Sequence, residues 1–446
     1  MLTLLHISDL HFRIKDANSQ FDRDDEIRGA IIRDLGIEER VDFDAMLVTG
    51  DLAYNGLTKE LERADQWFDE VRKRIGLTAE SVFIIPGNHD VNRDHVGETS
   101  VLMDAHKSIR GIADTEKRDA NVEAKLKDTS WDFLRSIGEY RNFAATHDCP
   151  TTAAELAWSL RLPKKIDEST PVRLHGLNSA ILSNKFDQRA NLVVTQFQFH
   201  RLKNPEECVE IVMCHHPSSW LLDGNEVDDH YRRYVNLVLT GHEHQSRCFP
   251  QGNGLQVCAG AVHPSRGEAN WQPSYNVIRL SVETNQQRRN LLIKVETRNW
   301  HKTGRAFVAA PWPGFASGHY EHRQDLPPVR IAESRTIPNT TAETPTITET
   351  ATVPEEPLAA ADDLAFASGR RKLIVHFFRL GIITRYEVVM SVGLYDESDE
   401  ALEGQARWAR IFERAEEKKQ FPALWTAVAS RDIELVGVPN PFTPGT

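Results

Sequence analysis

The sequence has few cysteines and no long apolar run. Five cysteines occur among 446 residues, and no two of them form a C-x-x-C pair. A disulfide framework and a cysteine-ligated zinc site are therefore not expected, and a reducing compartment fits this composition. Because no uncharged apolar stretch reaches about 18 residues, the sequence predicts no transmembrane helix.

The sequence has fewer basic than acidic residues. Lys and Arg number 53 against 65 Asp and Glu, which gives a formal net charge of −12. A general basic surface for nucleic acid or an anionic membrane is therefore absent, although a local basic groove is not excluded. The first apolar residues, 1–7, have no basic segment before them and no small-residue cleavage site after them. We therefore expect no signal peptide and a cytoplasmic protein.

The first 300 residues alternate short apolar runs with amphipathic helical patterns. Between residues 61 and 75, apolar side chains recur at spacings of three and four, which predicts a helix. Strands are expected at 3–7, 45–49, 82–85, 172–175, 209–214, 235–240 and 255–258, and as a hairpin at 275–282 and 290–298. Such alternation predicts an α/β sheet with helices on its faces. About residues 95–145 are expected to form a helical insertion.

A change of composition divides the chain near residue 325. Residues 336–357 hold eight Thr, four Pro and no Lys, Arg or aromatic residue. Such a segment cannot bury enough apolar surface to offset its ordering entropy. We therefore predict a first domain at 1–325, a disordered linker at 326–365 and a small all-α domain at 366–446. Because a flexible linker fixes no geometry, we expect no tight packing between the two folded regions.

Five segments at the ends of expected strands collect nearly all of the unusual polar residues. They are D-x-H at 9–11, G-D at 50–51, G-N-H-D at 87–90, H-H at 215–216 and G-H-x-H at 241–244. Loops at the carboxyl ends of strands converge on one crevice in α/β sheets. Each segment alone is a weak signal, but all five in this order indicate a single site.

The side chains in these segments are typical metal donors. They are Asp9, His11, Asp51, Asn88, His215, His242 and His244. Oxygen and imidazole donors suit Mn²⁺, Fe and Zn²⁺ without a thiolate. Seven donors exceed one tetrahedral shell and fit two divalent ions that share a bridging carboxylate. Two such ions attract a phosphate anion, and they lower the pKa of a bridging water toward about 7, which gives hydroxide at neutral pH.

The five segments resemble the motifs of the calcineurin-like metallophosphoesterase superfamily over about residues 1–300, without a substitution. The resemblance implies a four-layer αββα sandwich with two mixed β-sheets and a dinuclear metal centre. It implies that one ion is held by Asp9, His11 and His244, that the other is held by Asn88, His215 and His242, and that Asp51 bridges them. It also implies that His89 is the catalytic histidine, which is not a ligand and protonates the leaving oxygen or stabilises the phosphate.

Three neighbouring residues are candidates for supporting or substrate-binding roles. Asp90 either orients His89 by accepting its second ring proton or caps a turn. Arg93 either binds the substrate phosphate in bidentate fashion or is a surface residue. His216 either supports the site from behind or is structural. The sequence leaves these alternatives open.

The resemblance implies an enzyme, a metal-dependent phosphoric ester hydrolase. The short loops at 50–56 and 87–90 are similar to those of the small-molecule phosphodiesterase branch, which favours nucleotides or cyclic nucleotides as substrates. A metal-dependent nuclease acting on DNA or RNA is the alternative, and the acidic chain disfavours it. A third hypothesis is a metal-binding scaffold or sensor of low activity that acts through the C-terminal domain. The filled set of donor positions disfavours that hypothesis.

Residues 366–446 are similar to small helical, death-like adaptor domains that are called effector-associated domains in bacterial conflict systems. The segment has apolar helical faces and no constellation of catalytic residues. We therefore expect it to bind a protein partner and to be dispensable for chemistry.

Overall fold

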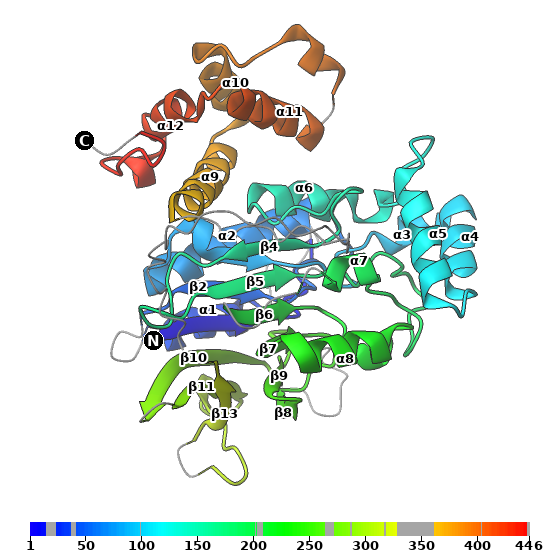
Figure 1. Ribbon diagram of the computed structural model, residues 1–446, viewed down its shortest axis with the longest axis vertical. Coiled ribbons are helices and arrows are strands. Elements are labelled where there is room, and N and C mark those ends of the chain that lie inside the picture. The colour runs from blue at the N-terminus through cyan, green and yellow to red at the C-terminus, as the bar shows by residue number, and fades with distance from the viewer. Residues whose placement is uncertain are drawn as a thin grey trace, which may run out of the picture.

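The computed structural model describes most of the chain. The described residues are 1–14, 24–36, 42–98, 100–200, 202, 208–263, 272–285, 288–315, 318–327, 361–402 and 404–443. Two stacked β-sheets form the body of the molecule, and a group of C-terminal helices lies beyond one side of it (Figure 1).

The first sheet has seven strands. They are β1 (Leu2–Ile7), β2 (Ala45–Val48), β3 (Val82–Ile84), β10 (Ser274–Asn285), β11 (Arg288–His301), β12 (Ala306–Ala309) and β13 (Tyr320–Leu326). Their order is β12-β11-β10-β1-β2-β3, and β13 pairs with β11. The strands β1, β2 and β3 run parallel, whereas β10 is antiparallel to β1. The expected hairpin is present as the long antiparallel pair β10 and β11.

The second sheet has six strands. They are β4 (Trp158–Arg161), β5 (Val172–Gly176), β6 (Val209–Met213), β7 (Leu237–Thr240), β8 (Arg247–Gln251) and β9 (Gly254–Cys258). Their order is β4-β5-β6-β7-β9-β8, with a parallel centre and an antiparallel strand at each edge. Every strand expected from the sequence is present, and the structure adds β4, β8, β12 and β13 at or near the sheet edges.

Helices cover the outer faces of both sheets. They are α1 (Asp25–Asp34), α2 (Thr58–Ile75), α3 (Arg93–Glu98), α4 (Ser100–Arg110), α5 (Thr115–Lys127), α6 (Gly138–Thr146), α7 (Gln196–Phe199) and α8 (Gly224–Tyr234), with short 3-10 turns η1 (Ala79–Ser81), η2 (Arg135–Ile137) and η3 (Ser218–Trp220). The expected helical insertion is present as several short helices and turns, α3 to α6.

The central strands are apolar on both faces because each separates two cores. Ile211 and Met213 of β6 belong to the core between the sheets, whereas Val212 belongs to the core under α4, α5 and α8. Successive strand side chains point to opposite faces, so the alternation assigns each residue to one core. The same contiguous cluster also includes Leu61 and Phe68 of α2, which pack under that helix. The order helix, sheet, sheet, helix confirms the expected four-layer α/β architecture.

The C-terminal region forms a helical unit with a core of its own. Its elements are α9 (Ala361–Arg379), α10 (Ile382–Ser391), η4 (Glu397–Ala401), α11 (Gly404–Glu417), α12 (Phe421–Ala429) and η5 (Ile433–Leu435). Phe377, Trp408 and Trp425 lie in that core. Most of the predicted linker, residues 328–360, lies outside the described residues, and its last five predicted residues begin α9. No helix in the described part of the chain is long and apolar enough to cross a membrane.

The expectation of loose packing between the two folded regions is wrong. Arg371 of α9 is buried, and its guanidinium donates to the carbonyl oxygens of Glu80 at 2.8 Å, Val82 at 2.8 Å and Asp148 at 2.9 Å. The same group lies 4.2 Å from the centre of the Phe83 ring. A linker's composition says nothing about which surfaces the helix beyond it matches, so the sequence did not reveal this contact.

Ion pairs flank the buried arginine. Arg72 of α2 makes a bidentate pair with Glu434 at 2.8 and 3.0 Å, and Arg379 of α9 makes one with Asp69 at 2.8 and 3.1 Å. Burial works against the charged form of Asp69, but Arg379 and Arg72 hold the pKa of that carboxyl below its ordinary value. Bidentate arginine–carboxylate pairs fix orientation as well as distance, so α9 is held in a defined pose on the first domain.

We expect Arg371→Met to lower the free energy of unfolding by about 1–3 kcal/mol, because three buried carbonyl oxygens lose their donor. Urea denaturation followed by tryptophan fluorescence measures this change. The matched control is Arg370→Met, because the Arg370 side chain is 38% exposed and lies 3.8 Å from Asp148. Equal losses in both variants would contradict a specific docking role for Arg371.

Candidate metal centre

The five motif segments follow five strands whose carboxyl ends meet. Asp9 and His11 follow β1, Asp51 follows β2, and Asn88 follows β3 in the first sheet. In the second sheet, His215 follows β6, and His242 and His244 follow β7. Backbone hydrogen bonds join the loops, from the Asp9 N–H to the Gly50 carbonyl at 3.1 Å and from the Gly241 N–H to the His215 carbonyl at 3.0 Å.

The structure brings all seven predicted donor residues together. The Nε2 atom of His244 lies 3.1 Å from Oδ1 of Asp9. Oδ1 of Asn88 lies 3.2 Å from Nε2 of His215 and 3.0 Å from Nδ1 of His242. These contacts form two groups of donors, one around Asp9 and one around Asn88.

Asp51 lies between the two groups. Its Oδ2 atom is 3.1 Å from Nε2 of His11 and 3.5 Å from Nε2 of His215. Among the described residues, the sets that could hold a metal ion are Asp9–His11–His244, Asp9–Asp51–His215, His11–Asp51–His89 and His215–His216–His242, each with ligand atoms within 4.8 Å of one another. Asp51 belongs to two of these sets, as do Asp9, His11 and His215, so the sets overlap in one cluster.

Backbone carbonyls orient two of the imidazoles. Nδ1 of His215 lies 2.7 Å from the Thr49 carbonyl oxygen, and Nδ1 of His11 lies 3.1 Å from the His263 carbonyl oxygen. Because a carbonyl can only accept, the ring hydrogen sits on Nδ1 in both residues. In the neutral form of each ring, the lone pair of Nε2 then faces the cluster, which is the tautomer that a metal ion requires.

The backbone at the donor residues is strained. The φ angles of Asp9, His11, Asp51, His242 and His244 are 56°, 46°, 55°, 69° and 55°, and they make up five of the nine positive-φ residues other than glycine in the described part of the chain. A left-handed conformation costs an L-residue roughly 1–2 kcal/mol. Strain concentrated in this way is typical of a functional site that the surrounding fold holds in place.

Glycine is required where two loops approach Asp51. A Cβ atom on Gly87 would lie 2.2 Å from Oδ1 of Asp51 and 2.4 Å from its backbone nitrogen. Gly50 has φ +92°, and a Cβ there would lie 2.7 Å from Nδ1 of His215. The two glycines therefore allow the loops after β2 and β3 to close around one carboxylate.

The electrostatics of the cluster favour an ionised carboxylate surrounded by imidazoles. Burial opposes ionisation of Asp51, but the charges of His215 and His89 hold its pKa well below the ordinary value. Burial likewise opposes protonation of His215, yet Asp51 raises the pKa of His215 to about 9. For His242, burial together with the His215 charge lowers the pKa to about 3.

His89 lies at the edge of the cluster. Its backbone N–H donates to Oδ1 of Asp51 at 2.7 Å, and its ring centre is 4.6 Å from that of His11. The Arg93 guanidinium approaches Nδ1 of His89 at 2.6 Å and the Tyr54 carbonyl at 3.5 Å. The Tyr54 carbonyl oxygen also lies 2.9 Å from Nδ1, and because a carbonyl only accepts while arginine only donates, the two contacts favour opposite tautomers of the ring. Burial lowers the pKa of His89 to about 4, so the free side chain is neutral.

The sequence left two roles open for Asp90, and its hydrogen bonds are those of the turn cap. Its Oδ1 accepts from the Ala53 N–H and its Oδ2 from the Gly87 N–H, both at 2.8 Å. These bonds tie the loop after β2 to the loop after β3. Burial, with the nearby Asp51 charge, raises the pKa of Asp90 to about 7.

His216 is buried beside the donors. Its Nδ1 lies 2.8 Å from the Ser179 hydroxyl, while its Nε2 has no hydrogen-bond partner in the described part of the structure. Burial, with the charges of His242 and His215, holds the pKa of His216 well below the ordinary value. Ser179 follows β5, so its position after a strand is the signal that could have found it.

Sequence reasoning missed several groups that shape the site. The carbonyls of Thr49 and His263 carry no side-chain signal, because any residue has a carbonyl. Trp220 lies next to His242, with ring centres 4.1 Å apart, and its place five residues after His215 is the available hint.

The donor chemistry fits a pair of divalent ions. Carboxylate, amide and imidazole donors converge without a thiolate, which suits Mn, Fe or Zn. Two buried carboxylates, Asp9 and Asp51, lie in one cluster. Buried charges of this kind are costly unless they are paired or coordinate metals.

Comparison with known proteins indicates a family for this chain. Residues 2–246 match the Calcineurin-like phosphoesterase family model, and residues 369–430 match that of the GTPase-associated adaptor domain. The uncharacterized metallophosphoesterase-like protein YydB of Bacillus subtilis is 22% identical over 279 residues, which are 58% of this chain and 53% of that protein. The chain thus spans about half the length of the curated relative that it matches.

Solved structures with a similar course of the chain have low overall similarity. One is a variant of Vps29 from Entamoeba histolytica, 11% identical, with a TM-score of 0.29, covering 73% of this chain and 100% of that one. Another is a putative 5′-nucleotidase from Staphylococcus aureus in complex with α-ketoglutarate, 13% identical, with a TM-score of 0.33, covering 78% and 56%. These TM-scores are too low for either structure to indicate a function for this protein. The family match covers more than half of the chain, and the protein therefore belongs to the calcineurin-like phosphoesterase family of metal-dependent phosphoesterases.

Proposed function

We propose that this protein is a phosphodiesterase that hydrolyses nucleotides or cyclic nucleotides with two divalent metal ions. The observation that carries the proposal is the meeting of seven donor side chains from five strand ends, in a cluster that Asp51 spans. The backbone strain at five of those residues supports a role that the fold alone does not require.

The proposed division of donors follows the contacts. Asp9, His11 and His244 would hold one ion, and Asn88, His215 and His242 the other, with Asp51 shared. When bound, such ions activate water and neutralise charge on the phosphoryl oxygens. Manganese, iron and zinc all fit the donors, and the choice among them is left to the metal analysis.

His89 is the proposed catalytic residue. Arg93 and the Tyr54 carbonyl both contact Nδ1 of His89 and so hold the ring in place beside the cluster. Ligand-type atoms of His89, His11 and Asp51 lie within 4.8 Å of one another. A phosphate bound at the cluster would therefore be within reach of His89. In this proposal His89 binds or protonates the leaving oxygen, and Arg93 positions His89 instead of binding phosphate directly.

We propose that residues 366–446 bind a protein partner, because residues 369–430 match an adaptor domain. We also propose a cytoplasmic location. All five cysteines are unpaired, which is typical of proteins in a reducing compartment.

Metal content tests the donor assignment. We expect two Mn²⁺ ions per chain in the loaded protein and fewer in Asp51→Asn, because the shared carboxylate contributes charge to both positions. His89→Ala should keep two ions, since His89 is not a proposed ligand. Elemental analysis after removal of free metal measures the stoichiometry, and loss of metal in His89→Ala would mean that the roles are misassigned.

Hydrolysis of bis(p-nitrophenyl) phosphate with Mn²⁺ tests the activity. We expect turnover of this diester, with kcat lowered about 10²–10⁴-fold in His89→Ala. His301→Ala, an exposed histidine on β11, is the control and should behave as the wild type. Absence of turnover would contradict an enzyme, and faster cleavage of single-stranded DNA than of the diester would favour the nuclease.

A truncation that ends at residue 330 tests the division of labour. All proposed site residues lie before this point, so we expect kcat/KM on the same diester to stay within a few-fold. The melting temperature should fall, because the carbonyls that Arg371 caps become exposed. A loss of activity beyond about tenfold, or about 1.4 kcal/mol of transition-state stabilisation, would show that the C-terminal domain helps to build the site.

A further inference from the structure

Trp220 contacts the candidate metal centre through a different set of rings from those that surround His89. Its ring centre is 4.1 Å from that of His242 and 6.2 Å from that of His216. His89, in contrast, packs against His11 and Tyr54. Trp220 is half-buried, and its indole Nε1 is buried without a hydrogen-bond partner in the described part of the chain.

The backbone of Trp220 is fixed from two sides. Its N–H donates to the Pro217 carbonyl at 2.9 Å within η3. Its own carbonyl accepts from the N–H groups of Asn191 and Leu192 at 3.2 and 3.1 Å. Because its backbone is fixed, Trp220 loses little main-chain entropy when a flat group stacks on the indole, which favours binding.

Arg189 extends over this indole from the neighbouring loop. Its guanidinium carbon lies 6.0 Å from the centre of the Trp220 ring, and one of its nitrogens pairs with Glu243 at 2.8 Å. Glu243 stands between the candidate ligands His242 and His244, so the pair ties Arg189 to the metal-binding loop. The Arg189 side chain is 66% exposed, and it can adjust its position without disturbing a core.

The Arg189–Trp220 pair is looser than a second arginine–aromatic pair at the site. The guanidinium of Arg13 lies 3.7 Å from the centre of the Tyr54 ring, a stacking contact. At 6.0 Å, Arg189 stands at the outer limit of a cation–π interaction. Arg189 therefore covers the indole of Trp220 less closely than Arg13 covers the ring of Tyr54.

We propose that Trp220 and Arg189 form the binding site for the base of a nucleotide substrate. The base stacks on the indole, and Arg189 moves over it and supplies positive charge near the phosphate. A nucleotide fits because it joins a flat π-system to the phosphate that the centre attracts. This inference rests on the proposed function and adds a residue pair that determines which esters the enzyme prefers.

The test compares two diesters that release the same p-nitrophenolate: the p-nitrophenyl ester of thymidine 5′-monophosphate and methyl p-nitrophenyl phosphate. We expect Trp220→Leu to lower the ratio of kcat/KM for the nucleotide ester over that for the methyl ester by about tenfold, because one base–aromatic stack is lost. The loss should appear in KM more than in kcat. Trp220→Phe should keep most of the ratio, since phenylalanine still stacks.

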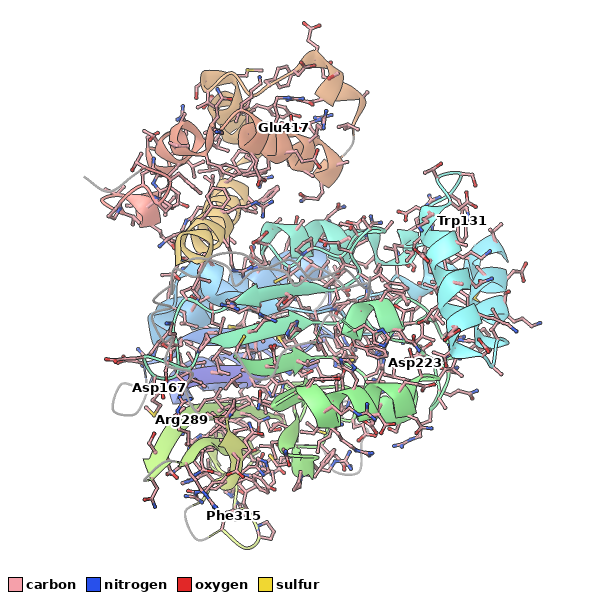
Figure 2. The ribbon with its side chains drawn as sticks, viewed as in Figure 1. Trp131, Asp167, Asp223, Arg289, Phe315 and Glu417 are labelled. Atoms are coloured by element: carbon pink, nitrogen blue, oxygen red, sulfur yellow. The ribbon has the colours of Figure 1, made fainter. Side chains whose placement is uncertain are left out.

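Two further variants make the result specific. Arg189→Gln, at an exposed position that does not endanger folding, should lower the same ratio by a few-fold. Trp131→Leu is the matched control, because Trp131 lies at the outer end of the helical insertion (Figure 2) and donates to Asp128 at 3.1 Å. An unchanged ratio in both Trp220→Leu and Arg189→Gln would overturn the proposal.

A binding measurement separates this inference from the proposed function. The probes are thymidine 5′-monophosphate and inorganic phosphate, titrated calorimetrically into the Mn²⁺-loaded protein. We expect Trp220→Leu to weaken the nucleotide by about tenfold relative to phosphate. Equal weakening of both probes would overturn the base site. If the wild type cleaves neither diester but Trp220→Leu still weakens binding of the nucleotide more than that of phosphate, only the proposed activity is contradicted.

Discussion

The burial of one carboxylate, Asp51, is the constraint on which the rest of the site depends. The residue is 1% exposed, and a buried charge is costly unless partners compensate it. His11 and His215 face one of its oxygens, and the backbone N–H of His89 donates to the other. Because these partners come from β1, β6 and β3, the carboxylate can be satisfied only when both sheets bring their carboxyl ends together.

This constraint explains features that the sequence alone presents as unrelated. Gly87 must lack a Cβ because Asp51 occupies that space, and Asp90 caps the same turn from inside. The left-handed backbone of the donor residues turns their side chains back toward one point instead of continuing the strand alternation. The sandwich around these loops holds the strain in place, since its two cores fix the strands on either side.

The sequence predicted that the seven donor-type side chains meet, because short motifs at strand ends are local signals. It predicted the α/β sandwich and the central strands for the same reason, since apolar runs and helical spacing are readable residue by residue. It could not decide between the roles of Asp90, because the answer depends on which N–H groups fold back toward its carboxylate. It missed the capping role of Arg371, whose three acceptors come from two separate stretches of the first domain. A docking contact of that kind is a property of matched surfaces and not of either segment.

The most direct test of this account is anomalous scattering from a crystal of the Mn²⁺-loaded protein. The account predicts two peaks about 3.5–4 Å apart, as in other two-metal sites, with Asp51 between them. One peak should lie beside Asp9, His11 and His244, and the other beside Asn88, His215 and His242. A single peak, or two peaks that do not share Asp51, would contradict the central claim.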